Sequence, residues 1–346
     1  MANTLLTISM ITREALRVLE NNLTFTKGVN RQYDDRFGVE GAKIGTVLNV
    51  RKPPRYVGRT GATLSVEDAT ETQVAVTLDT QFGVDINFSS EDLALKIDDF
   101  SKRFITPAVA TIANKIDNTG LALYTSVYNS VGAPGTTPNA LLTYLQAGVK
   151  LDNNAAPMDG QRSVVITPLM QATIVDALKG LFQQASAIAS QYRRGQMGTA
   201  IGFDWFMDQN CNTHTVGPLG GTPLCNGVPT TGATTLVTDG WTASAAARLK
   251  KGDVFTIADV NSVNPQSRQS TGEAQQFVVT ADVSSDGSGN LTAAISPAIT
   301  SAGAFQTVDA LPVDNAAITV VGAASTATPQ GILHHKDAFT LAMADL

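Results

Sequence analysis

Apolar and polar residues alternate over residues 46–51 and again over residues 72–78, and this two-residue period predicts two β-strands. Prolines and glycines separate the two stretches, which favours a long hairpin with its tip near residues 53–65. Alternation over residues 83–88 predicts that the returning strand continues that far. A two-stranded hairpin is marginal by itself and leaves its edges unpaired. We therefore expect it to find its partner in another chain.

A helical period follows the hairpin. An apolar stripe at 3.6-residue spacing predicts a helix over residues 107–129, about 35 Å long; the stripe comprises Phe104, Ile105, Ala108, Val109, Ile112, Ile116, Leu123 and Val127. Thr106 and Pro107 suit either the start of this helix or a kink within a longer one. Further helices are predicted near the N-terminus and from the acidic cap at residue 91; two more are predicted over residues 138–151 and 169–178.

The remaining pattern is strand-like. A buried strand is predicted over residues 162–168 and another over residues 201–209. Beyond about residue 215 the chain is rich in Gly, Thr and Pro, and short strands are predicted at 253–260, 275–283, 291–295 and 317–321. The segment from residue 332 onward predicts a closing strand. The pattern as a whole indicates an α+β body with an all-β module inserted at residues 215–325.

Composition narrows the class of protein. The 346 residues are 43% hydrophobic and 16% charged, which excludes a disordered chain, and no apolar run is long enough to span a membrane. The net charge of −6 disfavours a nucleic-acid-binding protein, because binding to phosphates requires a basic surface. The N-terminus does not have the pattern of a signal peptide. Cys211 and Cys225 are able to pair, but two cysteines in so long a chain favour reduced thiols.

Charge is distributed unevenly along the predicted hairpin. Residues 43–59 hold five basic residues and no acid, and an acidic group follows. We expect these charges to meet across two copies of the chain and to orient them, because exposed ion pairs add little stability. The candidate contact residues are Arg51, Lys52, Arg55 and Arg59 on the basic side and Glu67, Asp68 and Glu71 on the acidic side.

Candidate chemistry is sparse. Adjacent residues on a strand point to opposite faces, so His334 and His335 would not converge on one metal ion. The spacing of Cys211, His214 and Cys225 does not match a structural zinc site. No phosphate-binding loop, nucleophile elbow or acid–base pair is present. We expect no enzyme, no cofactor and no metal.

Several segments, in order, resemble tailed-bacteriophage major capsid (coat) proteins, in the branch of the short-tailed Salmonella phage coat protein with its inserted domain. The resemblance covers most of the chain and is carried by GAKIGTVLNVRKPPRY (41–56), VAVTLDTQFGVDINFSSEDLAL (74–95), DFSKRFITPAVATIANKID (99–117), SVVITPLM (163–170), LKKGDVFTIA (249–258), QSRQSTGEAQQFVV (266–279) and HKDAFTL (335–341).

This resemblance implies a Hong Kong 97-type capsid fold with an inserted all-β domain. It assigns residues 1–40 to an N-terminal arm, residues 41–88 to an extended loop and residues 89–137 to a peripheral domain with a spine helix. Residues 138–214 together with 326–346 would form an axial domain, and residues 215–325 a barrel-like insertion domain. Members usually continue well past the HKDAF segment, whereas this chain stops at Leu346. Either a C-terminal portion was removed, or this member closes its fold differently.

The resemblance also implies the function. Identical subunits in hexamers and pentamers would form an icosahedral virion shell in the host cytoplasm, enclosing double-stranded DNA without reading its sequence and without a membrane. Scaffolding, portal or decoration proteins are further partners that this would imply. The Thr-, Gly- and Ala-rich stretch after residue 213 supports an alternative, a β-rich virion decoration or surface-adhesion protein.

Overall fold

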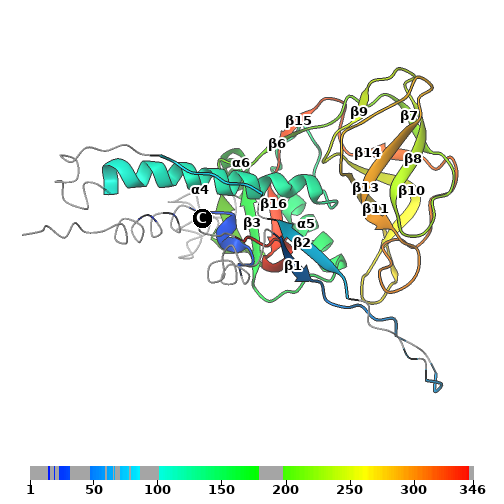
Figure 1. Cartoon of the computed structure of the whole chain (residues 1–346), viewed down its shortest axis with the longest axis horizontal. Coiled ribbons are helices and arrows are strands. Elements are labelled where there is room, and N and C mark those ends of the chain that lie inside the picture. Colours follow the sequence, from blue (N-terminus) through cyan, green and yellow to red (C-terminus); the bar gives the residue numbers. More distant parts are fainter. Residues whose placement is uncertain are drawn as a thin grey trace, which may run out of the picture.

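The chain folds into a mixed α+β body with a strand-rich module at one end (Figure 1). The structure is a computed structural model that describes Ala15, Leu19 and residues 23–31, 47–58, 61–64, 66, 71–77, 79–85, 101–178 and 198–342. Ala15 and Leu19 are helical, and the rest of the helix predicted near the N-terminus lies outside the described residues, as does the helix predicted from residue 91.

One long helical run crosses the body. It consists of a π-helical turn at Ser101–Ile105, helix α4 at Thr106–Leu121 and a 3-10 turn at Ala122–Ser126. The sequence left open whether Thr106 and Pro107 start a helix or lie within a longer one. The helical turn before Pro107 shows that they lie within the longer helical run. The predicted α-helical end at residue 129 is wrong, because α4 ends at Leu121 and the chain continues in the tighter 3-10 turn at Ala122–Ser126.

A four-stranded sheet forms the centre of the body, in the order β16-β3-β5-β4. Strand β3 is buried along its whole length and pairs parallel with β5 and antiparallel with β16. The strands are β3 (Arg162–Ile166), β4 (Thr199–Ala200), β5 (Phe203–Met207) and β16 (Ile332–His335). The strands predicted at 162–168, 201–209 and from 332 are thus confirmed, with shorter bounds.

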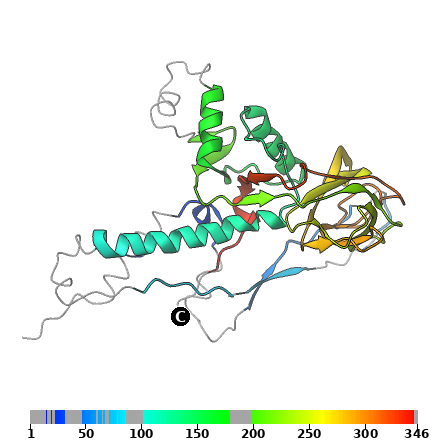
Figure 2. The same cartoon turned by 90° about the horizontal axis from the view of Figure 1, so that it is seen from above.

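Two helices cover this sheet and share its core. They are α5 (Leu141–Asn153) and α6 (Pro168–Leu178), and both were predicted within three residues. Tyr144 of α5 and Ile174 of α6 pack with Val164, Ile166 and Trp205 of the sheet. Figure 2 shows α5 and α6 on one side of α4 and the β1–β2 hairpin on the other.

Six strands form a separate sheet in the order β14-β10-β11-β13-β8-β7. A bridge between Leu224 and Ala317 joins the two outermost strands, so the sheet closes on itself as a barrel around Phe255 and Phe277. Its strands are β7 (Gly221–Cys225), β8 (Ala233–Trp241), β10 (Val254–Val263), β11 (Ser270–Val279), β13 (Leu291–Ile299) and β14 (Ile318–Val320).

Four short strands form two further pairs beside this barrel. Strand β15 (Ala327–Pro329) pairs with β6 (Thr213–Thr215), and β12 (Val283–Ser284) pairs with β9 (Ala247–Leu249). The four strands predicted in this part of the chain are confirmed, although the one predicted at 275–283 is split between β11 and β12. Strands β7 and β8 were missed. Their stretch is rich in glycine, and at Gly240 the backbone has a φ of +71° and approaches Thr222 too closely for a side chain.

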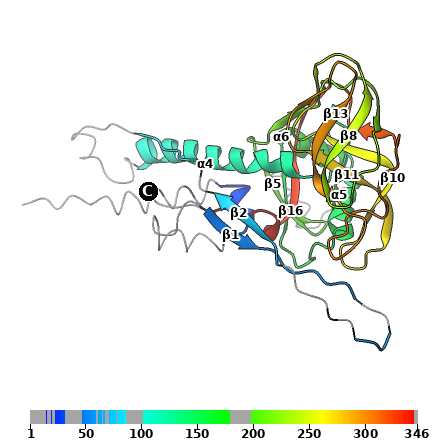
Figure 3. The same ribbon diagram turned by 45° about the vertical axis from the view of Figure 1, so that its right-hand side comes forward.

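The predicted hairpin forms from β1 (Val47–Arg51) and β2 (Gln73–Thr77), paired antiparallel with Arg51 opposite Gln73. Figure 3 shows it extending away from the body. The predicted continuation of the strand over residues 83–88 is wrong for residues 83–85, which are not in a strand; residues 86–88 lie outside the described part of the chain. Every described side chain of β2 is exposed or half-buried. The pairing is therefore local, and packing contributes little to it.

Candidate assembly surface

The basic residues Arg51 and Lys52 lie exposed at the end of β1 that leads into the hairpin tip. A guanidinium nitrogen of Arg51 lies 3.3 Å from a carboxylate oxygen of Glu71 within the same hairpin, and both side chains are mostly exposed. Such a pair contributes at most about 1 kcal/mol. Glu71, which was predicted to face an adjacent copy, is thus already paired with Arg51 in its own chain. Lys52 is exposed, and its backbone N–H donates to Thr72 across the hairpin.

The hairpin is anchored to the barrel just beyond β1. The guanidinium of Arg55 lies 5.7 Å from the centre of the Phe305 ring, within the range of a cation–π contact. Arg268 donates one hydrogen bond to the backbone carbonyl of Tyr56 and a second, 3.2 Å long, to the carbonyl of Gly303. Sequence reasoning missed this anchor because more than two hundred residues separate its halves and neither half carries a local signal.

The side chains further along the hairpin are strongly exposed. Leu64 is 77% exposed and Val66 is 82% exposed, which is unusual for large aliphatic residues. Arg59, Glu67 and Asp68 lie outside the described residues. Of the seven predicted contact residues, the structure therefore brings together Arg51 and Glu71 and holds Arg55 against the barrel.

A buried carboxylate attaches the N-terminal segment to α4. Asp117 is 1% exposed; its Oδ2 accepts a 2.7 Å hydrogen bond from the backbone N–H of Thr24, and its Oδ1 accepts from the backbone and hydroxyl of Thr26. One turn further on, Gly120 leaves room for the Phe25 ring. Asp117 was not part of the predicted apolar stripe, although it is buried on α4 together with Val109, Ala113 and Leu121, and nothing in the sequence indicated its role.

A second buried acid lies near Asp117. Asp208, just after β5, accepts a 2.7 Å hydrogen bond from the backbone of Asn210 at Oδ1, while its buried Oδ2 has no partner among the described residues. Burial raises the pKa of Asp208, and the negative charge of Asp117 raises it further, against the opposing effect of the Asn210 bond. Burial and the charge of Asp208 also raise the pKa of Cys211 to about 12.

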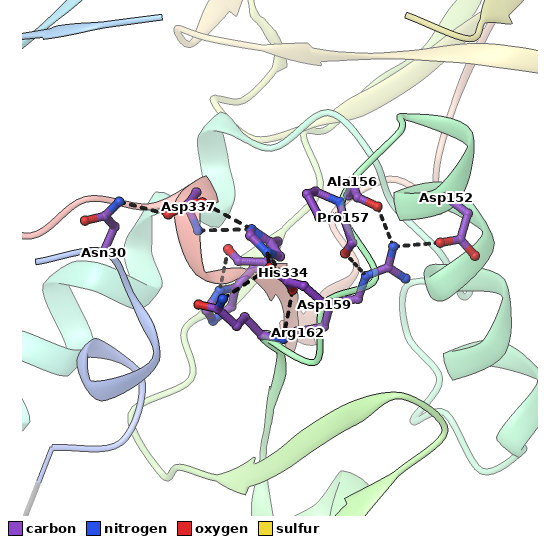
Figure 4. Close-up of polar contacts among 10 residues, drawn as sticks. Asn30, Asp152, Ala156, Pro157, Asp159, Arg162, His334 and Asp337 are labelled. Atoms are coloured by element: carbon purple, nitrogen blue, oxygen red, sulfur yellow. Dashed lines mark hydrogen bonds and ion pairs between the residues drawn. The ribbon is translucent and has the colours of Figure 1, made fainter. Parts of the chain in front are cut away.

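A polar network fastens the C-terminal strand (Figure 4). Nε2 of His335 lies 3.1 Å from a carboxylate oxygen of Asp159, and Asn30 donates a 2.8 Å bond to Asp337. The buried Arg162 donates to Asp152 and to two backbone carbonyls of the loop after α5. The network links the N-terminal segment, the residues around β16 and the end of α5, and so it positions these elements relative to one another.

Each of the three histidines contacts polar or aromatic residues of its own chain. His334 packs edge-on against the rings of Phe25 and Phe339, which also contact each other, and burial lowers its pKa. His214 lies 2.8 Å from the buried Asp253 and 3.2 Å from the Tyr124 hydroxyl. Cys211 and Cys225 are both free thiols. Within the described part of the chain, no three His, Cys, Asp or Glu side chains gather closely enough to hold a metal ion.

No described helix is both long and apolar enough to cross a membrane.

The family model described as "P22 coat protein - gene protein 5" matches residues 3–346. The chain belongs to the P22 coat protein family. It is therefore a structural protein of a phage capsid shell and part of the virion. No curated protein matches the chain.

Solved structures give more distant similarities. A structure from Mycobacterium phage Che8 is 14% identical, with 88% of this chain and 89% of that chain covered and a TM-score of 0.41. The mature capsid of bacteriophage PhiM1 is 8% identical, with coverage of 80% and 82% and a TM-score of 0.34. The CUS-3 coat protein I-domain is 28% identical over 29% of this chain and 94% of its own length, with a TM-score of 0.21.

Proposed function

We propose that many copies of this chain assemble, as hexamers and pentamers, into an icosahedral shell that encloses double-stranded phage DNA. The fold is then of the Hong Kong 97 type, with the β1–β2 hairpin in the extended loop, α4 as the spine helix and β7–β14 as the inserted domain. The family match supports this proposal. Because each copy would make several modest contacts, a closed shell would be far more stable than any single pair.

The exposed hairpin is the observation that carries the proposal. Its strands bury little against their own chain, and two large aliphatic side chains beyond them are almost fully exposed. A basic face that includes Lys52, Arg55 and Arg59 would orient it on an acidic surface of an adjacent copy, with Glu67 and Asp68 as further members of the contact. The hairpin would therefore act as an arm between subunits.

The net charge supports a shell that does not bind its contents tightly. A chain of net charge −6 would repel DNA on its inner face, which favours packing without sequence-specific binding. Assembly would take place in the host cytoplasm, and scaffolding, portal or decoration proteins would be its further partners.

Charge reversal on the hairpin tests this function. Arg55→Glu combined with Arg59→Glu should reduce the yield of shells at least tenfold while the thermal unfolding of the subunit changes little, because exposed charges orient copies and contribute little to folding. Electron microscopy and sedimentation measure the yield. Lys115→Glu combined with Lys251→Glu, two exposed lysines outside the hairpin, gives the same change of charge and should assemble normally. Normal shells from the hairpin variant would contradict the proposed arm.

A further inference from the structure

Three exposed valines lie on the outside of the barrel, on segments that are hydrogen-bonded to one another. Val228 and Val313 are each 60% exposed, and Val237 is also exposed. The backbone N–H of Asn226 bonds to the carbonyl of Val237 at 3.0 Å, and that of Gly227 bonds to Asp314 at 2.7 Å. These bonds bring the loop after β7, strand β8 and the segment before β14 together. We call Val228, Val237 and Val313 the valine seam.

Two acids border the valine seam. Asp239 is two residues beyond Val237 on the same strand, so both side chains project from the same outer face. Asp314 follows Val313 directly. Asp239 lies opposite Leu224 of β7 on the neighbouring strand, and Asp314 accepts a hydrogen bond from the backbone N–H of Gly227, just after β7. Burial, together with the charges of both acids, raises the pKa of Cys225 to about 11. They border one continuous surface.

No basic residue of the neighbouring sequence neutralises these acids. The chain has no Lys or Arg between Arg194 and Arg248, nor between Arg268 and Lys336. Strands β7, β8 and β14 therefore carry none. A surface that combines exposed valines with unneutralised carboxylates fits a partner that is both basic and aliphatic.

The hairpin has the complementary composition. Lys52 and Arg55 are exposed on it, and the equally exposed Leu64 and Val66 follow. Its own barrel contacts it at Arg55 and Tyr56, through Phe305 and Arg268, whereas the Leu64 side chain is 77% exposed. The hairpin of one copy is thus held to its own barrel just beyond β1, and the exposed Leu64 and Val66 remain available to another copy.

We propose that the valine seam of each copy receives the hairpin of a second copy, with Leu64 and Val66 against the valines and the basic residues beside Asp239 and Asp314. The proposal rests on the arm function proposed above and names the surface on which the arm docks. The contact is heterologous, because the hairpin and the seam are different surfaces, and heterologous contacts generate rings when the rotation closes.

Disulfide crosslinking between full-length chains tests the contact. A chain with Leu64→Cys is mixed with one carrying Val313→Cys, assembled and oxidised with diamide. A crosslinked dimer should form from this mixture. When either variant is mixed with the unsubstituted chain instead, the yield of crosslinked dimer should be at least tenfold lower, because Cys225 is buried and Cys211 is half-buried. Val149→Cys, on the exposed face of α5, is the matched control. The seam would be overturned as the docking site if Leu64→Cys crosslinked to Val149→Cys and not to Val313→Cys. It would also be overturned if no crosslink formed at all.

A charge exchange separates this inference from the function on which it rests. Asp239→Lys should lower the yield of shells about tenfold or more, and adding Lys52→Glu to the same chain should restore the yield. Asp259→Lys, which changes an exposed acid elsewhere on the barrel, should have no effect on the yield. Normal assembly of the Asp239→Lys chain would refute the seam, even where the Arg55→Glu and Arg59→Glu chain fails to assemble. Failure of the unsubstituted chain to form shells would instead refute the proposed function and the seam with it.

Discussion

Single buried carboxylates determine how the N-terminal segment is held. Asp117 accepts three hydrogen bonds from Thr24 and Thr26, which satisfies its burial. Asp208 is also buried, and its Oδ2 has no partner in the part of the chain that the structure describes, so its ionised form lacks comparable compensation. The two acids thus act in opposite directions: Asp117 attaches the segment, whereas an ionised Asp208 weakens the same region.

This contrast predicts a pH-dependent effect of Asp208→Asn. The pKa of Asp208 is raised in the folded chain, so folding favours the protonated carboxyl. The stability that this contributes is fully present below the ordinary Asp pKa of about 3.9, and it is lost as the pH rises through the pKa of the folded chain. At pH 7 the neutral Asn should raise the melting temperature, and the gain should shrink towards pH 4. Thermal unfolding at both pH values measures it. Asp85→Asn, an exposed acid, is the control, and a loss of stability at pH 7 would refute the role given to Asp208.

At the scale of elements, the end of α4 shows where packing overrides helix propensity. A side chain at Gly120 would place its Cβ 2.8 Å from the Phe25 ring, whereas one at Gly148 of α5 would lie 3.5 Å from Phe203, an ordinary contact. Both glycines lie in helices, where alanine is intrinsically better by about 1 kcal/mol. The same substitution is thus expected to have opposite signs at the two positions.

Gly120→Ala should lower the free energy of unfolding by about 1–3 kcal/mol, because the N-terminal segment must move to admit the methyl group. Gly148→Ala, the matched control, should leave it unchanged or raise it. Urea unfolding of both variants measures the difference, and Phe25→Leu added to Gly120→Ala should recover part of the loss. An equal effect of the two substitutions would mean that Phe25 does not pack on Gly120 as described.

Much of this element structure is predictable from local patterns. The alternation of β1 and β2, the stripe on α5 and the apolar run of β3 each depend on neighbours in sequence, and each was predicted. The close packing at Gly120 of α4 depends on Phe25, and the anchor of the hairpin depends on Arg268 and Phe305. These contacts join residues that are far apart in sequence, and no local period encodes them.

The candidate assembly surface was also predictable only where its residues are close together in the sequence. Charge clustering singled out the basic side of the hairpin, but it did not show that Arg51 pairs with Glu71 in its own chain. The valine seam gave no signal, because its residues come from three segments that only the closed barrel brings together.

At the scale of the whole molecule, the account depends on an arm whose hairpin buries little against its own chain. Cryo-electron microscopy of particles assembled from the full chain tests this most directly, because it shows where each hairpin lies. We predict closed shells in which every β1–β2 hairpin lies across an adjacent copy. Particles whose hairpins lie folded against their own subunits, or a solitary subunit that never assembles at high concentration, would contradict the account.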